Sequence, residues 1–168
     1  MVRLGESQRL QMVGNNVWIQ NIKEWIEQNH PNLVTTGYKI TSSDTTDYNC
    51  IAWAAGSTEE WWWPDAKGGD YWPPNILREE SLTAFIMAYQ TLGYEVCENA
   101  LLEAGFEKIA IYVLDGKPQH ASRQLPNGKW TSKLGQYEDI EHNSLEGLEG
   151  SIYGEVACVM KRRLIERE

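Results

Sequence analysis

The spacing of apolar and polar residues divides the chain into a helical first half and a strand-rich second half. Apolar side chains recur at helical spacing over residues 16–29, and Pro31 ends this predicted helix. A second amphipathic helix is predicted over residues 81–89, followed by Gly93, although a start near Leu77 also fits. A short buried helix is predicted to start at Cys50 and to run to about Gly56, after an extended segment at residues 38–43.

The second half of the chain predicts an antiparallel sheet. Strands are predicted over residues 108–114, 119–125, 129–133 and 153–163. Asp115-Gly116 and Asn127-Gly128 are typical hairpin turns, and residues 136–144 are predicted to form a polar connection. The expected fold class is therefore α+β: a single domain over residues 1–168, with N-terminal helices packed on a C-terminal antiparallel sheet.

The charge and the length of the chain restrict the classes of partner that it can bind. The chain has 168 residues and a formal net charge of −9, and its one basic cluster is Lys161-Arg162-Arg163. Nucleic-acid binding requires clustered cations, so we expect no nucleic-acid partner. No segment approaches the length of a membrane span, so we expect no membrane partner. The first residues are polar and unlike a signal peptide, which favours the cytoplasm or export without a classical signal.

The cysteines differ in their surroundings. Their number, three, is odd and argues against a disulfide framework. Apolar neighbours predict that Cys97 and Cys158 are buried structural thiols. Cys50 instead lies where a polar loop changes into an apolar helix. No Cys or His spacing resembles a zinc site, so neither a metal nor another cofactor is expected.

The position of Cys50 suggests a nucleophile. The unpaired N–H groups of a first helical turn favour a thiolate, so we expect the thiol pKa to be lowered. His120 follows on a predicted strand, where its imidazole is placed to exchange a proton with the thiol. The alternatives are a small buried cysteine and a hydrogen-bonded sheet histidine. Together, in this order and on these elements, the two residues favour a catalytic pair.

A third residue is expected to orient His120. If Leu125 pairs with Gly128, His120 lies opposite Lys133, with Thr131 and Ser132 close by. Of these we include Ser132 in the candidate catalytic set, although the third member stays open. Asp139 reaches the histidine only if the chain folds back. The backbone N–H of Cys50 and a donor at Asn49 or Asp47-Tyr48 are candidates to hold an oxyanion.

An aromatic loop spans residues 57–75 and contains Trp61-Trp62-Trp63 and Tyr71-Trp72. Its rings either form the wall of a substrate cleft or pack the loop against the helices. We include Trp53 and Trp63 as candidate substrate contacts. His142 is expected at the surface or at a helix cap, and His30 has no evident role.

The segments around these residues resemble a group of bacterial proteins in the papain-like cysteine hydrolase superfamily. The resemblance covers residues from about 47 to 160. It is carried by Tyr48-Asn49-Cys50-Ile51-Ala52-Trp53, Lys108-Ile109-Ala110-Ile111-Tyr112, His120-Ala121 and Trp130-Thr131-Ser132-Lys133-Leu134-Gly135. It implies a papain-like fold with a hydrolase site at Cys50 and His120.

The chain departs from the related NlpC-type peptidases at one position. Those enzymes have a catalytic histidine where this chain has Lys108. Either the histidine comes from the next strand, at His120, or the site has degenerated.

Two functions follow. The first is a cysteine-dependent hydrolase or acyltransferase that acts on an amide bond in a peptide, a protein or another amide-containing molecule. The second is an inactive papain-like module, of a binding or toxin/immunity type, that uses the Trp-rich loop for recognition.

Overall fold

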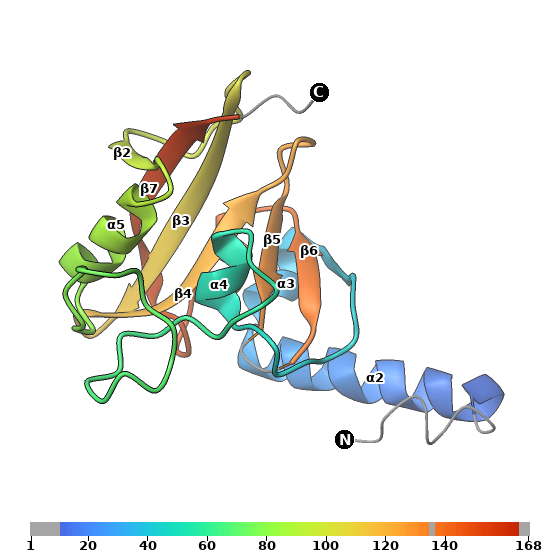
Figure 1. The fold of residues 1–168 in the computed structure, drawn as a ribbon. Helices are drawn as coiled ribbons and strands as arrows, with labels where there is room; N and C mark the ends of the chain where they lie inside the picture. Colours follow the sequence, from blue (N-terminus) through green and yellow to red (C-terminus); the bar gives the residue numbers. More distant parts are fainter. Residues whose placement is uncertain (1–10, 135–136, 165–168) are drawn as a thin grey trace, which may run out of the picture.

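The computed structural model describes residues 11–134 and 137–164, with side chains from Ile19 onward. In this part of the chain, an antiparallel sheet of seven strands has the order β1-β6-β5-β4-β3-β7-β2 (Figure 1). The strands are β1 Tyr38–Ile40, β2 Glu95–Cys97, β3 Phe106–Leu114, β4 Lys117–Gln124, β5 Trp130–Lys133, β6 Asp139–His142 and β7 Glu155–Arg163. The predicted α+β class is confirmed.

Helices cover both faces of the sheet. They are α2 Gln11–Asn29, α3 Asn32–Thr36, α4 Cys50–Ala54 and α5 Leu82–Gln90, with a 3-10 turn, η2, at Leu145–Leu148. Two apolar cores follow. The front core joins α4, α5 and the aromatic loop to the sheet, and the back core joins α2, α3 and η2 to the opposite face. Figure 1 shows α4 in front of β4 and β5. No helix in the described residues is long and apolar enough to cross a membrane.

Most predicted elements are present. The predicted helices at residues 16–29 and 81–89 correspond to α2 and α5, and Ser81 caps α5 through its side chain. The predicted polar connection at residues 136–144 was wrong, because β6 lies within it. Its sequence, Asp139-Ile-Glu-His142, has little apolar character, yet it pairs with β5 and β1. The short elements α3 and β2 were not predicted.

The two hairpins fix which side chains share a face. Asp115 and Gly116 have φ values of 52° and 80°, as a two-residue type I′ turn requires. In the second hairpin Leu125 pairs with Lys129 rather than with Gly128. This shift of one residue turns every side chain of β5 to the other face relative to the predicted register. As a result Ser132, rather than Lys133, lies on the same face as His120.

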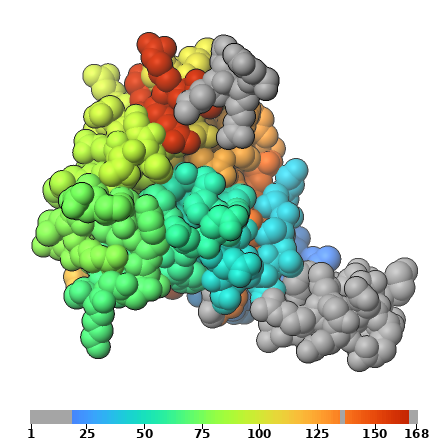
Figure 2. Space-filling model, viewed as in Figure 1, coloured from blue at the N-terminus to red at the C-terminus, as the bar shows by residue number. Residues whose placement is uncertain are grey.

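Asn49 positions α4. Its side-chain oxygen accepts hydrogen bonds from the N–H groups of Ala52 and Trp62, each at 3.1 Å. Its amide nitrogen donates to the Trp62 carbonyl at 2.7 Å. One buried side chain therefore caps the helix and attaches the aromatic loop to it. Figure 2 shows this segment, in teal and green, spreading over the viewed face of the molecule.

We predict that Asn49→Ala lowers the free energy of unfolding by about 2–4 kcal/mol, since it removes a cap and leaves buried backbone groups unpaired. Ser81→Ala, which removes only the α5 cap, is the matched control and should cost about 1 kcal/mol. Urea unfolding measures both. Equal losses in the two variants would contradict the role given to Asn49.

Candidate functional site

Cys50 lies beside a break in the sheet. Arg123 pairs with Thr131 and Gln124 with Trp130, but residues 119–122 of β4 have no backbone pairing with β5. We call this break the strand split. The Cys50 thiol donates to the Gln119 carbonyl at 3.9 Å. The change of register between Tyr112 and Val113 makes Gln119 the extra residue of a β-bulge. The bulge and the split thus meet at the cysteine.

Burial dominates the ionisation of Cys50. The side chain is 6% exposed. Burial raises the thiol pKa, while the N–H groups of Ala121, Ile51 and Cys50 and the charge of Lys133 lower it, with a net value of about 11. The expected N–H donors are therefore present at the start of α4. The predicted lowered pKa was nevertheless wrong for this conformation, because desolvation outweighs those donors.

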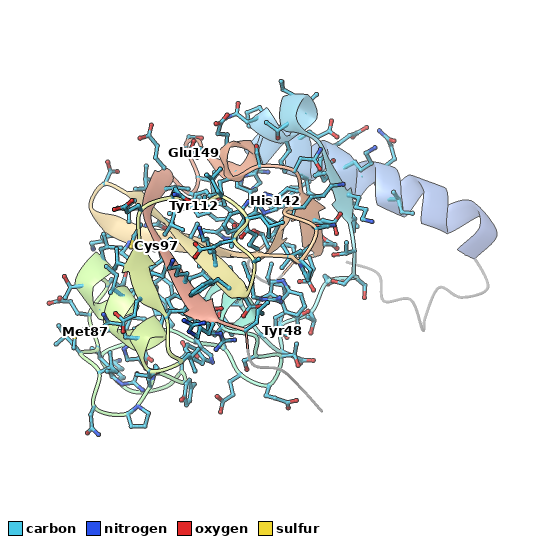
Figure 3. All side chains as sticks on the ribbon, turned by 90° about the horizontal axis from the view of Figure 1, so that it is seen from above. Tyr48, Met87, Cys97, Tyr112, His142 and Glu149 are labelled. Atoms are coloured by element: carbon cyan, nitrogen blue, oxygen red, sulfur yellow. The ribbon has the colours of Figure 1, made fainter. Side chains whose placement is uncertain are left out.

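His120 belongs to a buried polar network on the back face. Its Nε2 lies 3.0 Å from the Ser132 hydroxyl, which lies 2.8 Å from Nε2 of His142. Ser122 adds a third contact to the Ser132 hydroxyl at 2.7 Å, and its hydroxyl lies 3.3 Å from that of Tyr112. Figure 3 shows Tyr112 and His142 within the body of the molecule. One hydroxyl, that of Ser132, therefore joins side chains from β4, β5 and β6.

The hydrogen bonds assign the proton on each ring. Nδ1 of His142 lies 2.9 Å from the Ser144 carbonyl, which can only accept, so Nδ1 carries the hydrogen. Burial lowers the pKa of His142 to about 4, so the ring is neutral near pH 7 and its Nε2 accepts from Ser132. Ser132 then accepts from Nε2–H of His120. Nδ1 of His120 is left as a buried lone pair without a partner in the described residues.

Tyr153 packs against this network on the back face. Its ring stacks on His120 with centroids 4.1 Å apart and on His30 at 4.8 Å. Burial raises the pKa of Tyr153, and an ionised Cys50 raises it further. Through this stacking, the Tyr153 ring covers the His120 ring on the back face.

Cys50 and His120 are near the same point of β4 but are not in contact. Ala121 belongs to the front core with Cys50, so strand alternation directs His120 to the back face. No hydrogen bond joins the two side chains within the described residues.

Ser132 is the candidate that the structure places against His120. Thr131, Lys133 and Asp139 lie on the other face. Thr131 accepts from the Trp53 indole, and Tyr48 donates to Asp139 at 2.7 Å. The Lys133 amine donates to the carbonyls of Thr45 and Tyr137. These three residues therefore hold the front loops rather than orient His120.

The candidate substrate contacts are mostly packed. The Asn49 side chain holds α4 and the aromatic loop: its oxygen accepts from Ala52 and Trp62, and its amide donates to the Trp62 carbonyl. The Trp53 ring stacks on Tyr48 at 5.2 Å and lies under the Arg123 guanidinium. Trp63 meets the edge of Phe85.

Other expectations need correction. His142 was expected at the surface or at a helix cap, but it is fully buried in the network, on β6. The alternation of Asp139-Ile-Glu-His142 with period two is the signal that would have predicted a strand here, with His142 on the same face as Ile140. Cys97 and Cys158 are free, but they are only partly buried. Gly135 lies outside the described residues.

Lys108 has a structural role. It is 2% exposed and donates to the Asn99 carbonyl and side chain at 3.0 and 3.1 Å. Lys108 lies four residues before Tyr112 on β3, and Tyr112 pairs with His120. Roughly 13 Å of strand therefore separates Lys108 from the position of His120 along the sheet. No group of three or more potential metal ligands forms within the described residues.

We predict that nitrogen NMR shows neutral His120 with its proton on Nε2 and neutral His142 with its proton on Nδ1. Ser132→Ala should remove this preference in His120, because its Nε2–H loses its acceptor, while the Ser144 carbonyl still holds His142. A proton on Nδ1 of His120 in the unaltered protein would contradict the assignment.

The buried histidines predict acid lability. Burial lowers the pKa of His142 in the folded protein to about 4, below its ordinary value of 6.5. Its contribution to stability is complete above pH 6.5 and is lost as pH falls toward 4, by about 3 kcal/mol. Urea unfolding at each pH measures the loss. His142→Gln should show a shallower decline, since the glutamine does not titrate, and the difference between the two proteins cancels other groups. Parallel curves would contradict the prediction.

Comparison with known proteins identifies the family to which this chain belongs. Searches of the curated proteins and of the solved structures found no match to this chain. A family model described as a domain of unknown function, DUF7689, matches residues 39–161. The matched segment holds Cys50, His120, Ser132 and His142 and covers most of the chain. The protein therefore belongs to the DUF7689 family.

Proposed function

We propose that this protein is a cysteine-dependent hydrolase or acyltransferase acting on an amide bond, with Cys50 as nucleophile and His120 as general base. The observation that carries the proposal is the unpartnered Nδ1 of His120. A buried imidazole is held with that lone pair free, beside the strand split that Cys50 fills. The proposal includes a papain-like arrangement, in which a helix that starts with the thiol packs on an antiparallel sheet.

The network is costly for a purely structural core. Burial lowers the pKa of both His120 and His142, so each ring opposes folding when it is protonated. The Nδ1 atom of His120 additionally forgoes a hydrogen bond. Buried groups with strongly shifted pKa values and unmet hydrogen bonds concentrate at functional sites. This pattern favours a role in proton transfer over a role in packing alone.

The chemistry has two stages. The thiol proton passes to Nδ1 of His120 as the sulfur attacks the amide carbonyl, and the resulting oxyanion takes donors from the N–H groups of Cys50 and Ile51. The C–N bond then breaks, the imidazolium gives its proton to the leaving amine, and an acyl-thioester remains on Cys50. Water or another nucleophile, deprotonated by His120, releases the acyl group.

The described conformation is closed. The thiol is 6% exposed, and its pKa of about 11 keeps it protonated near pH 7. The proposal therefore requires the front loops to open, so that water and substrate reach Cys50 and the strand split widens toward His120. Hydration of the thiol removes the largest cause of its raised pKa. Three unpaired cysteines suit a reducing compartment, so we place the protein in the cytoplasm.

The raised thiol pKa favours a second candidate, an inactive binding or toxin/immunity-type module. Recognition by the Trp-rich loop would then depend on few rings. Trp62 and Trp72 are buried, and Trp63 and Tyr71 pack against the front core. Trp61 is the partly exposed tryptophan of the loop that the front core does not include.

The test uses p-nitrophenyl acetate as a small acyl donor, in a protein with Cys97→Ser and Cys158→Ser so that Cys50 is the remaining thiol. We expect a stoichiometric burst of p-nitrophenolate and acetylation of Cys50, found by mass spectrometry, that Cys50→Ala abolishes. His120→Ala should slow the burst about 100-fold or more at pH 7. Ser132→Ala should slow it less, since the His120 imidazole remains in place and loses only the partner of its Nε2–H.

Thermal unfolding and circular dichroism identify variants that have lost the fold. If His120→Ala does not fold, the rate of the burst in the milder variant Ser132→Ala tests the coupling instead. Acetylation at the same rate in folded His120→Ala and in the parent protein across pH 6–9 would show that the pair is uncoupled. The binding module would then be the better description.

A further inference from the structure

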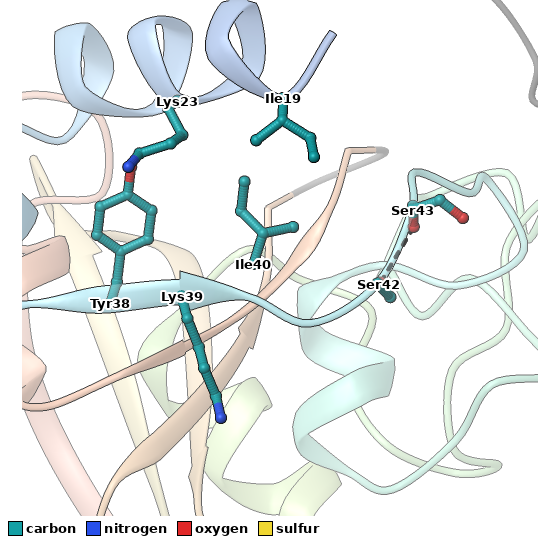
Figure 4. A pocket seen from close by; sticks show the side chains of 7 residues that line it. All are labelled: Ile19, Lys23, Tyr38, Lys39, Ile40, Ser42 and Ser43. Atoms are coloured by element: carbon teal, nitrogen blue, oxygen red, sulfur yellow. Dashed lines mark hydrogen bonds between the residues drawn. The ribbon is translucent and has the colours of Figure 1, made fainter. Parts of the chain in front are cut away.

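A groove runs between α2 and the edge strand β1. Its volume is about 540 Å³, and its lining includes Ile19 and Lys23 of α2 with Tyr38 and Ile40 of β1. Figure 4 shows α2 lying along β1, with Ile19 and Ile40 pointing toward each other across the gap. Ser42 and Ser43 close one end of the groove.

The backbone of β1 faces this groove with groups that no other described strand pairs. Among the described strands, β1 is at the edge of the sheet and pairs only with β6. Thr41 donates to Asp139, and the Gly37 carbonyl accepts from Asn143, so alternate residues of β1 direct their backbone groups to β6. The N–H and C=O groups of Tyr38 and Ile40 therefore point outward from the edge.

These groups define the chemistry that fits. An added strand would pair with Tyr38 and Ile40, and its alternate side chains would enter the gap beneath Ile19. A strand that joins an edge beside a helix gains main-chain hydrogen bonds and apolar contact together. Lys23 forms no ion pair with a described residue. Glu27, one turn along α2, accepts from the Tyr38 hydroxyl at 2.7 Å. A carboxylate on the added strand would complement this lysine.

We propose that this groove binds an extended peptide segment of a partner protein, with apolar residues alternating with polar ones and an acidic residue opposite Lys23. The proposal goes beyond the function at Cys50, because β6 and β5 separate β1 from β4. A second copy of this chain is a poorer occupant. Antiparallel pairing of two β1 strands about Lys39 would set the two Lys39 side chains next to each other, and adjacent like charges oppose such pairing.

The experiment titrates nitrogen-labelled protein with an acetylated, amidated peptide of alternating Val and Thr that carries one central Glu. We expect saturable NMR shifts at the amides of Tyr38, Ile40 and Ile19, and slower hydrogen exchange at the Tyr38 and Ile40 amides. The same peptide with Lys in place of Glu should bind about threefold more weakly, as expected for one exposed ion pair.

Two substitutions at Ile40 distinguish the contribution of its backbone N–H to peptide binding from that of its side chain. Ile40→Pro removes the outward N–H without removing a bond to β6, and proline is tolerated on an edge strand. It should weaken binding about tenfold more than Ile40→Ala, which keeps the N–H and loses the side-chain contact. Lys117→Ala, which removes an exposed charge on β4, separated from β1 by β5 and β6, should bind like the unaltered protein.

The proposal is overturned if neither peptide gives saturable shifts, or if folded Ile40→Pro binds as tightly as Ile40→Ala. It is also overturned if sedimentation shows dimers that Ile40→Pro dissociates, since a second copy would then be the occupant. If Ile40→Pro does not fold, the hydrogen exchange of the Tyr38 amide decides: unchanged exchange at saturating peptide contradicts edge pairing.

Discussion

The strand split between β4 and β5 is the constraint on which the site depends. Where the two strands part, the backbone groups of Gln119 and Ala121 lose ladder partners inside the molecule, and a buried polar group left unpaired costs about 1–3 kcal/mol. The Cys50 thiol donates to the first of these groups and accepts from the second. On the other face, the Ser132 hydroxyl holds β4, β5 and β6 together through side chains. The split is thus filled from the front by a cysteine and closed from the back by a serine.

This arrangement connects packing to chemistry. Because α4 must fill the split, Asn49 has to hold its first turn in place, and the same turn supplies the N–H donors around the thiol. Because the back face is closed by hydroxyls and imidazoles, the histidines stay neutral and their tautomers are fixed. The same low exposure that fixes the tautomers also raises the thiol pKa. This closed conformation keeps the side chains of the site ordered but leaves the Cys50 thiol unreactive, so the proposed reaction requires the front loops to open.

The family match separates the two proposed sites. Residues 39–161 begin within β1 and end within β7, so they contain the strand split and its whole network. The groove differs, because α2 precedes the matched segment while most of β1 lies inside it. The amide chemistry is therefore proposed on residues shared with the family model, whereas the peptide groove depends on a helix outside it.

The sequence by itself determined the α+β class, the helix that begins at Cys50 and the Asp115-Gly116 hairpin, because each depends on local spacing, capping or turn chemistry. It did not determine the register of β4 with β5. Pro126-Asn127-Gly128 is compatible with a two- or a three-residue loop, and a difference of one residue decides whether Lys133 or Ser132 shares a face with His120. It also missed β6 and the burial of His142, since a short polar strand is stabilised by its two neighbours rather than by its own composition. The raised thiol pKa was decided by tertiary structure, because the desolvation that outweighs the local N–H donors comes largely from core residues distant in sequence.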